Sequence, residues 1–264
     1  MAIDRKISSL VVLLCGIFLS CEEEASIGIE TENVNLLAVE AVLTNENINH
    51  AIRLTLPYQK QNESAKPVSD ATVSVSDGTT TVELIHSVDG EYLTPKMRFV
   101  SGRTYTLTIA HNGRQYIAQD SPLPVEPLNA LSYSNAEGGY RFNFFETGTE
   151  PYYIEYIVDW SDTPSCTIDC RAKIVYYDLK NIDANELFKP NQSDFIFPAH
   201  STVIRRKFSV SDQYRAFLRS MLSETQWRGS VFDVQRDNAP TNLSEGAIGF
   251  FAVSTVAADT VKIP

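Results

Sequence analysis

The chain has 264 residues, and 33 acidic side chains outnumber 22 basic ones, for a formal net charge of −11. This balance argues against a protein that binds nucleic acid through its phosphates and against a polybasic membrane-surface protein. The length is sufficient for one large domain or two ordinary ones.

The first 21 residues have the pattern of a bacterial lipoprotein signal. After a short basic stretch, Ile7–Leu19 is mostly apolar but shorter than the roughly 20 apolar residues that span a bilayer as a helix. Ser20-Cys21 then resembles a lipobox, in which the cysteine thiol is acylated and the chain is cut before it. The alternative is an ordinary cleaved signal with an incidental cysteine. We predict that 1–21 is the lipoprotein signal segment and that Cys21 is the lipidated first mature residue.

An acidic run follows the predicted anchor. Glu22, Glu23 and Glu24 resemble the tag that sends lipoproteins of Bacteroidetes-type bacteria to the outer face of the outer membrane. Carboxylates beside an anionic headgroup layer are repelled from it. The alternative is that they only begin a solvated tether. Residues 22–33 have little apolar periodicity and are predicted to form an acidic stalk.

The part from 34 to 120 is predicted to be a β-sandwich, because short strands recur about every ten residues with turn signals between them. The predicted strands are Val34–Thr44, Ala51–Leu56, Ala71–Val75, Thr81–Ile85, Gly90–Leu93, Tyr105–Ile109 and Tyr116–Ala118. Asp77-Gly78 and Asn112-Gly113 are typical of tight hairpin turns. The order of blocks from Pro67 to Ile109 resembles an immunoglobulin-like, prealbumin-type module, a fold that carries no reaction by itself.

A proline-rich segment, 121–128, is the predicted linker, since each proline fixes φ and stiffens the chain. We therefore expect a fragment of about 30–125 to fold alone. A second β-rich domain is predicted over 129–264.

Aromatic residues mark two predicted strands of this second domain, in 140–145 and 152–160. Tyr152, Tyr156 and Trp160 share one face of the latter, and Tyr153 lies on the other. An aromatic stripe can form a carbohydrate platform. Alternation with polar residues is also what a half-buried strand requires, so core packing is the favoured interpretation.

One amphipathic helix is predicted over about 212–226. The residues at helical spacing are Tyr214, Phe217, Leu218, Met221 and Leu222. Ser209 with Asp212 resembles a capping box, and Ser211 is a competing cap. Gly229 is expected to close the unit. We expect the apolar face to pack on a sheet, with a partner-binding role as the alternative.

Cys166 and Cys170 are the cysteines that follow the predicted anchor, in Cys-Thr-Ile-Asp-Cys. A disulfide needs Cα atoms about 4.4–6.8 Å apart, which this spacing reaches only across a tight turn. Pro164 and Asp169 favour a turn, and an exported protein meets an oxidising setting. A small disulfide-closed loop is favoured over free thiols. A zinc site is disfavoured, because zinc normally takes four ligands.

Motifs for catalysis are missing from the sequence. It has no nucleophile elbow, zinc-protease helix, phosphate-binding loop or dinucleotide glycine pattern. Four scattered histidines, His50, His86, His111 and His200, lie by turns or strand ends and are expected to be structural or surface residues. Asp77 and Asp89 could bind calcium in a loop, but neither lies in a spaced run of oxygen ligands. We predict no enzyme activity, no catalytic residues, no metal site and no cofactor.

The end of the chain carries a resemblance to a known family. Its blocks are the helix with Trp227, Gly229–Asp233, Pro240–Ser244 and Gly246–Ser254, and Cys21-Glu22, Leu43-Thr44-Asn45 and Ala71–Gly78 stand before them in the same order. This order resembles the Bacteroidetes lipoprotein family catalogued as domain of unknown function 4249. The resemblance implies a surface-exposed outer-membrane lipoprotein, often associated with TonB-dependent transporters. It assigns no catalytic or binding residues.

We therefore expect a mainly β, surface-exposed outer-membrane lipoprotein that is a non-catalytic binding or accessory component of a TonB-dependent transport system. The expected partners are the outer membrane, through the lipid, and a TonB-dependent transporter; no nucleic acid is expected. Tyr152, Tyr153 and Trp160 are candidate contacts only if they are exposed. An adhesin-like or structural surface protein and an unrecognised hydrolase are the alternatives.

Overall fold

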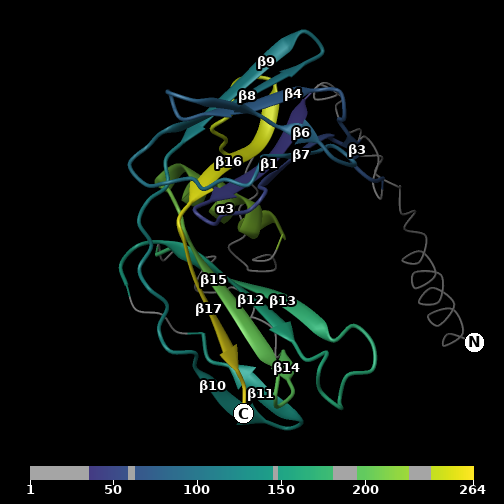
Figure 1. Cartoon of the computed structure of the whole chain (residues 1–264), viewed down its shortest axis with the longest axis vertical. Coiled ribbons are helices and arrows are strands. Elements are labelled where there is room, and N and C mark those ends of the chain that lie inside the picture. Colours follow the sequence, from purple (N-terminus) through teal and green to yellow (C-terminus); the bar gives the residue numbers. More distant parts are fainter. Residues whose placement is uncertain (1–35, 59–62, 145–147, 181–194, 226–238) are drawn as a thin grey trace, which may run out of the picture. The chain divides into compact units, whose positions relative to one another are not determined.

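In the computed structural model, strands dominate the described residues, which are 36–58, 63–144, 148–180, 195–225 and 239–264. Figure 1 shows these strands in separate sheets, with helix α3 (Asp212–Thr225) beside them. The predicted mainly β fold is confirmed. No helix within these ranges has the length and hydrophobicity to cross a bilayer.

Two sheets form a sandwich around the first core. The strands of one sheet are β1 (Leu37–Thr44), β2 (Ala51–Leu56), β3 (Lys66–Pro67), β6 (Ile85–His86), β7 (Glu91–Leu93) and β16 (Ala247–Ser254). Those of the other are β4 (Thr72–Ser76), β5 (Thr81–Glu83), β8 (Tyr105–His111) and β9 (Arg114–Asp120). Among the described residues, the strand order of the first sheet is β16-β1-β2-β7-β6, and β3 pairs with β2. The strand order of the second sheet is β5-β4-β8-β9.

Alternation along the strands places the apolar residues of this sandwich inside. Leu43 of β1, Ile52 of β2 and Leu107 of β8 are fully buried in one cluster, and removal of such side chains from water drives the sheets together. The predicted Asn112-Gly113 hairpin joins β8 to β9, with φ of +49° and +72° at the two positions, as a two-residue turn of this kind requires.

Strand β16 lies outside the predicted sandwich range but completes its first sheet. It pairs in parallel with β1 along all eight residues, from Leu37↔Ala247 to Thr44↔Ser254, and Phe251 is fully buried in the sandwich core. The pairing is close at Gly249, where a Cβ would lie 2.0 Å from the Val39 carbonyl oxygen. The predicted range 34–120 therefore omits one strand of the first sheet, which bears on the expectation that a fragment of about 30–125 folds alone.

Asn242 ties β16 to β9. Its Nδ2 donates to the Phe251 carbonyl (2.7 Å) and to the Gln119 carbonyl (3.0 Å), and its Oδ1 accepts from the Phe251 N–H (3.1 Å). One side chain thus satisfies backbone groups of two strands that belong to different sheets.

We expect Asn242→Ala to lower the free energy of unfolding by about 1–3 kcal/mol, because it leaves the Phe251 backbone groups without these partners. Urea unfolding measures the loss. Asn135→Ala, at an exposed position of the chain, is the matched control and should change stability by less than about 0.5 kcal/mol. Equal effects of the two substitutions would contradict the role of Asn242.

The remaining sheets form a second layered unit. One sheet contains β12 (Tyr152–Asp159), β13 (Arg171–Asp178), β15 (Thr202–Ser209) and β17 (Val256–Lys262), in the described order β13-β12-β15-β17. The other contains β10 (Tyr133–Ala136), β11 (Gly139–Phe142) and β14 (Ile196–Phe197), in the order β10-β11-β14. Only Thr255 separates β16 from β17, so one continuous stretch joins the first sheet of the sandwich to the β12 sheet.

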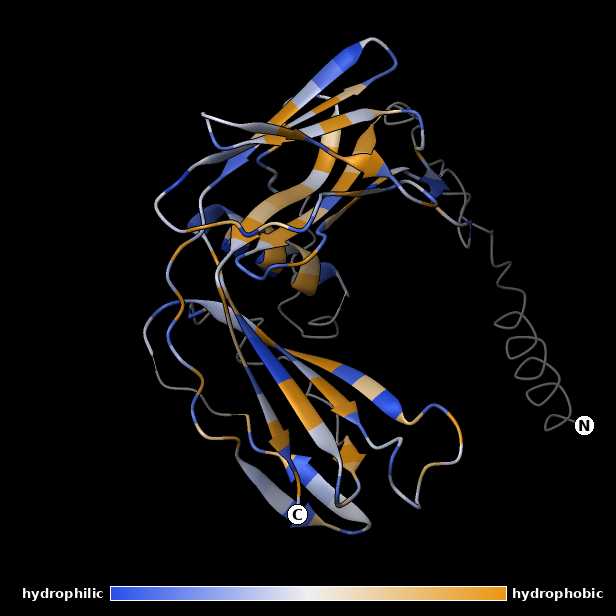
Figure 2. Cartoon of the chain, viewed as in Figure 1, coloured by the Kyte–Doolittle hydropathy of each residue, from blue (hydrophilic) through white to orange (hydrophobic). Residues whose placement is uncertain are grey.

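An aromatic core lies between these two sheets. Tyr152 and Tyr156 of β12 pack with Phe142 and Phe197, and the Phe142 and Phe197 rings stack at 4.3 Å. Figure 2 shows the matching alternation of hydrophobic and hydrophilic residues along the long strands. The aromatic stripe of β12 is thus core, as the favoured interpretation predicted.

Helix α3 (Asp212–Thr225) forms a third core with the outer face of β16 and the second face of β12. Ser211 is its N-cap, since its Oγ accepts from the Tyr214 N–H at 3.3 Å. Ser209 belongs to β15, so the competing cap is the correct one. Gln226 and Gly229, at the predicted end of the helix, lie outside the described residues.

The proline-rich segment 121–128 has no regular structure and connects β9 to β10. It and the next residues run beside β15, where the buried Lys207 Nζ lies 3.5 Å from the Pro127 carbonyl and the buried Arg205 guanidinium donates to the Asn129 carbonyl at 2.7 Å. Val34–Pro264 forms one compact unit.

Candidate functional site

Two adjoining pockets lie against the outer face of the first sheet. Their volumes are about 410 and 470 Å³, within the range of about 300–1,000 Å³ that is usual for ligand sites. Glu40, Val42, Tyr153 and Glu155 line both pockets. We call the pair the groove: β1 and β2 form its floor, and helix α3 and the β12 sheet supply its walls.

Aromatic rings line the pocket beside the helix. Tyr214 stacks on Phe250 with ring centroids 5.0 Å apart, and Phe217 lies 5.3 Å from the same ring. Tyr153 and Tyr214 hydrogen-bond through their hydroxyls, and burial raises the pKa of both. Phe217 and Tyr177 are only partly buried. This pocket therefore offers apolar surface to a ligand.

Charged residues line the other pocket in a cross-strand row. Glu40 of β1 lies opposite Arg53 of β2, and Arg53 lies opposite Glu91 of β7. These positions are on the outer face of the sheet because their neighbours along each strand point into the sandwich core. The row presents two carboxylates with a guanidinium between them.

A cluster of ion pairs closes the wall opposite this row. Arg206 of β15 binds both carboxylate oxygens of Glu46, with Nε–Oε1 at 3.2 Å, and its Nη1 donates to Glu155 at 2.9 Å. Lys173 Nζ lies 2.5 Å from the other oxygen of Glu155. The Arg206 guanidinium also lies over the Phe208 ring, 4.9 Å from its centroid. The cluster links the loop after β1 to the β12 sheet.

His50 lines the groove but is fixed by its own hydrogen bonds. Its Nε2 lies 3.2 Å from the Glu46 carbonyl and 3.1 Å from the Met97 carbonyl, and its Nδ1 faces the Thr44 N–H. Burial is the main cause that lowers its pKa, so the ring is neutral at pH 7. A neutral ring held by backbone groups is a structural histidine.

The Glu46–Arg206 pair makes stability depend on pH. Burial raises the pKa of Glu46, but the hydrogen bonds and charge of Arg206 outweigh it, and this pKa lies below the ordinary 4.5. The unfolded chain then binds more protons in acid, so the stabilisation is present above about pH 4.5 and is lost as pH falls through the lowered pKa. We expect Glu46→Gln to reduce this acid-side loss of unfolding free energy.

Urea unfolding between pH 3 and 7 measures how steeply the unfolding free energy falls as the pH is lowered. Glu83→Gln is the control, because Glu83 is exposed on β5. A wild-type slope retained in Glu46→Gln would contradict the assignment.

The profile of one protein family, the domain of unknown function DUF4249, matches residues 22–260. The chain belongs to this family. No curated protein matches it. The DUF4249 match confirms the family resemblance predicted from the order of the sequence blocks.

The predicted export features of this DUF4249 protein lie outside the described residues. These are Cys21, as the lipid anchor, and Glu22, Glu23 and Glu24, as the export tag. The family match begins at Glu22.

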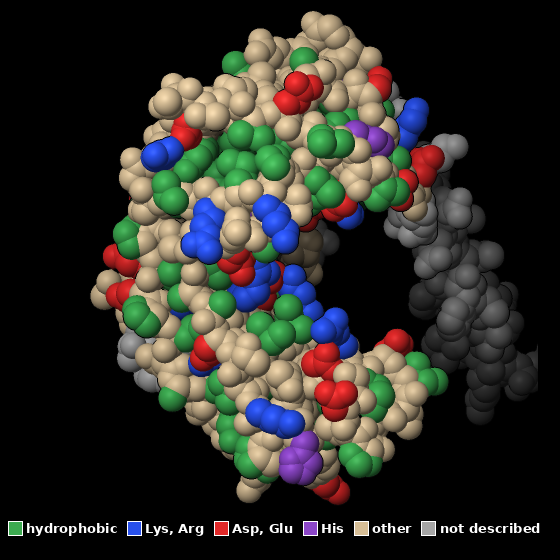
Figure 3. All heavy atoms as spheres, viewed as in Figure 1, with side chains coloured by type: hydrophobic (Ala, Val, Ile, Leu, Met, Phe, Trp, Pro, Cys, Tyr) green, Lys and Arg blue, Asp and Glu red, His purple; other side chains and the backbone are tan. Residues whose placement is uncertain are grey.

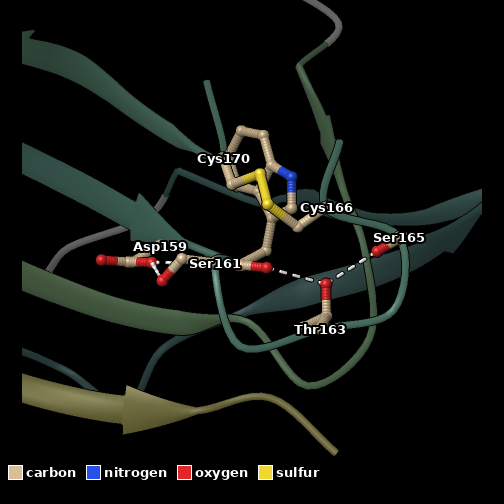
Figure 4. Close-up of a disulfide and its surroundings, with 7 residues drawn as sticks. Asp159, Ser161, Thr163, Ser165, Cys166 and Cys170 are labelled. Carbon is tan, nitrogen blue, oxygen red and sulfur yellow. Dashed lines mark hydrogen bonds between the residues drawn. A yellow bond between two sulfur atoms is a disulfide. The ribbon is translucent and has the colours of Figure 1, made fainter. Parts of the chain in front are cut away.

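Cys166 and Cys170 form a disulfide in the β12–β13 loop, with their Cα atoms 5.5 Å apart. Figure 4 shows this disulfide beside the hydrogen bonds of the loop. The Thr163 hydroxyl donates to the Trp160 carbonyl at 2.8 Å and lies 2.8 Å from the Ser165 hydroxyl. The cystine closes a tight turn and lies away from the groove.

Other residues singled out by sequence have structural surroundings. Asp77 accepts from the Thr79 and Thr80 N–H groups of its own turn, and Asp89 lies in a turn with φ of +48°. Across the described ranges, no three His, Cys, Asp or Glu residues gather to hold a metal ion.

The candidate contacts of the aromatic strand are mostly buried. Tyr152 and Tyr153 are 2 % and 7 % exposed, and Trp160 is half-buried. The two tyrosines were candidate contacts only if they were exposed, and both are buried.

Sequence reasoning missed the charged residues of the groove. Glu40 and Arg53 interrupt apolar strands, and that interruption was the available signal. Arg206 and Glu155 are 51 positions apart, and nothing local in the sequence connects them.

Proposed function

We propose that the protein is a surface-exposed outer-membrane lipoprotein and a non-catalytic binding component of a TonB-dependent transport system. The groove carries the binding half of this proposal, because it combines apolar surface with charges held in fixed positions. Figure 3 displays basic and acidic side chains close together beside a hollow in the face of the molecule that it shows. The proposed location at the outer membrane rests on the signal pattern that ends at Cys21 and on the acidic run that follows.

This location is tested by Cys21→Ala. This variant should incorporate no labelled palmitate and should leave the membrane fraction. Replacement of Glu22, Glu23 and Glu24 by alanine should keep acylation but reduce cleavage by protease added to whole cells. Palmitate incorporation that survives Cys21→Ala would refute the anchor, and unchanged protease sensitivity would refute the export tag.

The partner is tested by isolating the tagged protein from detergent-solubilised membranes. We expect a TonB-dependent transporter to co-purify with the wild-type chain and not with Cys21→Ala. Recovery of neither a transporter nor any other transport component would favour an adhesin-like or structural role.

A hydrolase is the second candidate, because acidic side chains line the groove. A general acid among a carboxylate pair needs a raised pKa. The pKa of Glu46, in the ion-pair cluster beside the groove, is lowered, and Glu155 of the groove is held by two cations. These observations favour binding over hydrolysis. Turnover of a surface glycan or peptide by the purified protein would establish the hydrolase instead.

A further inference from the structure

The charges of the groove are unequally satisfied. Arg206 and Lys173 are engaged by Glu46 and Glu155. Glu40 and Glu91, by contrast, take part in none of the ion pairs between residues of the described part of the chain. Arg53 lies between them in the cross-strand register, so the open row has an excess of negative charge. A ligand that brings positive charge to this row is favoured electrostatically.

The position of Glu40 connects this charge to the apolar pocket. Glu40 is exposed and lines both pockets, and partly buried Phe217, Tyr177 and Met221 line the apolar one. A cation bound at Glu40 would therefore lie directly beside a pocket that can bind a large apolar group.

Glu91 offers a second carboxylate, and its distance from Glu40 determines how far apart two cations of one ligand would have to be. Glu40 and Glu91 lie on β1 and β7, which are separated by β2. Two strand spacings correspond to about 10 Å. Side chains two residues apart on one face of an extended peptide start about 7 Å apart, and the length of lysine side chains covers the remaining distance. Pockets of about 410 and 470 Å³ lie in the usual range for small ligands, which suits a few residues of peptide.

We propose that the groove binds short, diffusible cationic peptides, with an aromatic or large aliphatic side chain in the apolar pocket and two basic side chains on Glu40 and Glu91. This inference rests on the proposed binding function, and it names the class of ligand. It does not depend on the identity of the transporter.

The test is isothermal titration of the full-length protein, purified in detergent from membranes, with acetyl-Phe-Ala-Lys-Ala-Lys-amide, in which the phenylalanine and both lysines share one face of the extended chain. The control peptides replace both lysines by glutamate, or phenylalanine by serine. We expect the lysine peptide to bind, each control to bind at least about tenfold more weakly, and affinity to fall as salt screens the charges.

Variants of the protein localise the binding. Glu40→Gln and Phe217→Ala should each lower the affinity for the lysine peptide by about tenfold. Glu40→Gln removes a charge-assisted contact, and Phe217→Ala removes apolar surface. Glu83→Gln, on a different sheet, should bind as wild type does. Thermal unfolding of each variant separates lost binding from lost folding.

The proposal is overturned if the lysine peptide fails to bind at about 1 mM, if the glutamate peptide binds equally, or if Glu40→Gln folds and binds unchanged. Recovery of a transporter without peptide binding would refute this inference and leave the transport role standing. Peptide binding without recovery of any transporter would support this inference and count against the transport role.

Discussion

A fragment of residues 30–125 should fail to fold, although it contains nearly all the strands of the sandwich. It lacks β16, which pairs with β1 along its whole length and fills the core with Phe251 and Val253, 0 % and 3 % exposed. Loss of one buried phenylalanine alone costs about 3–5 kcal/mol, and domains are stable by only about 5–15 kcal/mol. The fragment should therefore show poor dispersion in an amide NMR spectrum.

A matched fragment restores the missing strand. Residues 239–254, fused behind residue 125 through a short Gly-Ser linker, bring back β16 and the Asn242 contacts. This fusion should give a dispersed spectrum and a cooperative unfolding transition. A folded 30–125 fragment without the fusion would show that β16 is dispensable.

Leu222→Ala should be more damaging to helix α3 than Phe217→Ala. Leu222 is fully buried in the third core, so its truncation should lower the free energy of unfolding by about 2–5 kcal/mol. Phe217→Ala should cost less, about 1–2 kcal/mol, because its ring is only partly buried and lines the groove.

Guanidinium unfolding of the two variants provides the comparison, and both replacements put alanine at interior positions of the same helix. A loss for Phe217→Ala as large as that for Leu222→Ala would place Phe217 in the core. Its assignment to the ligand-facing wall would then be wrong.

Local sequence signals predicted the local structure. The Asn112-Gly113 turn was predictable because few residue pairs accept positive φ at both positions, and the alternation in β12 separates Tyr152 from Tyr153 as the structure does. The spacing of Leu218 and Leu222 indicated which face of the helix is buried. Each of these features depends on neighbours along the chain.

Features that depend on distant residues were not predictable in this way. The apolar run of β16 suits a strand in either unit, and only its pairing with β1 decides which sheet receives it. The groove has the same origin, since Glu46 and Arg206 are 160 positions apart. The disulfide spans four positions, so sequence could favour it on turn geometry alone.

Crosslinking in intact cells tests most directly whether the protein works by binding a transporter. Cells that express the tagged wild-type protein are crosslinked, the protein is isolated, and mass spectrometry identifies its partners and the crosslinked residues. We predict a TonB-dependent transporter among these partners, with its crosslinks on residues of the chain after the acidic stalk. Recovery of no transporter, in cells that express a neighbouring transporter gene, would contradict this account.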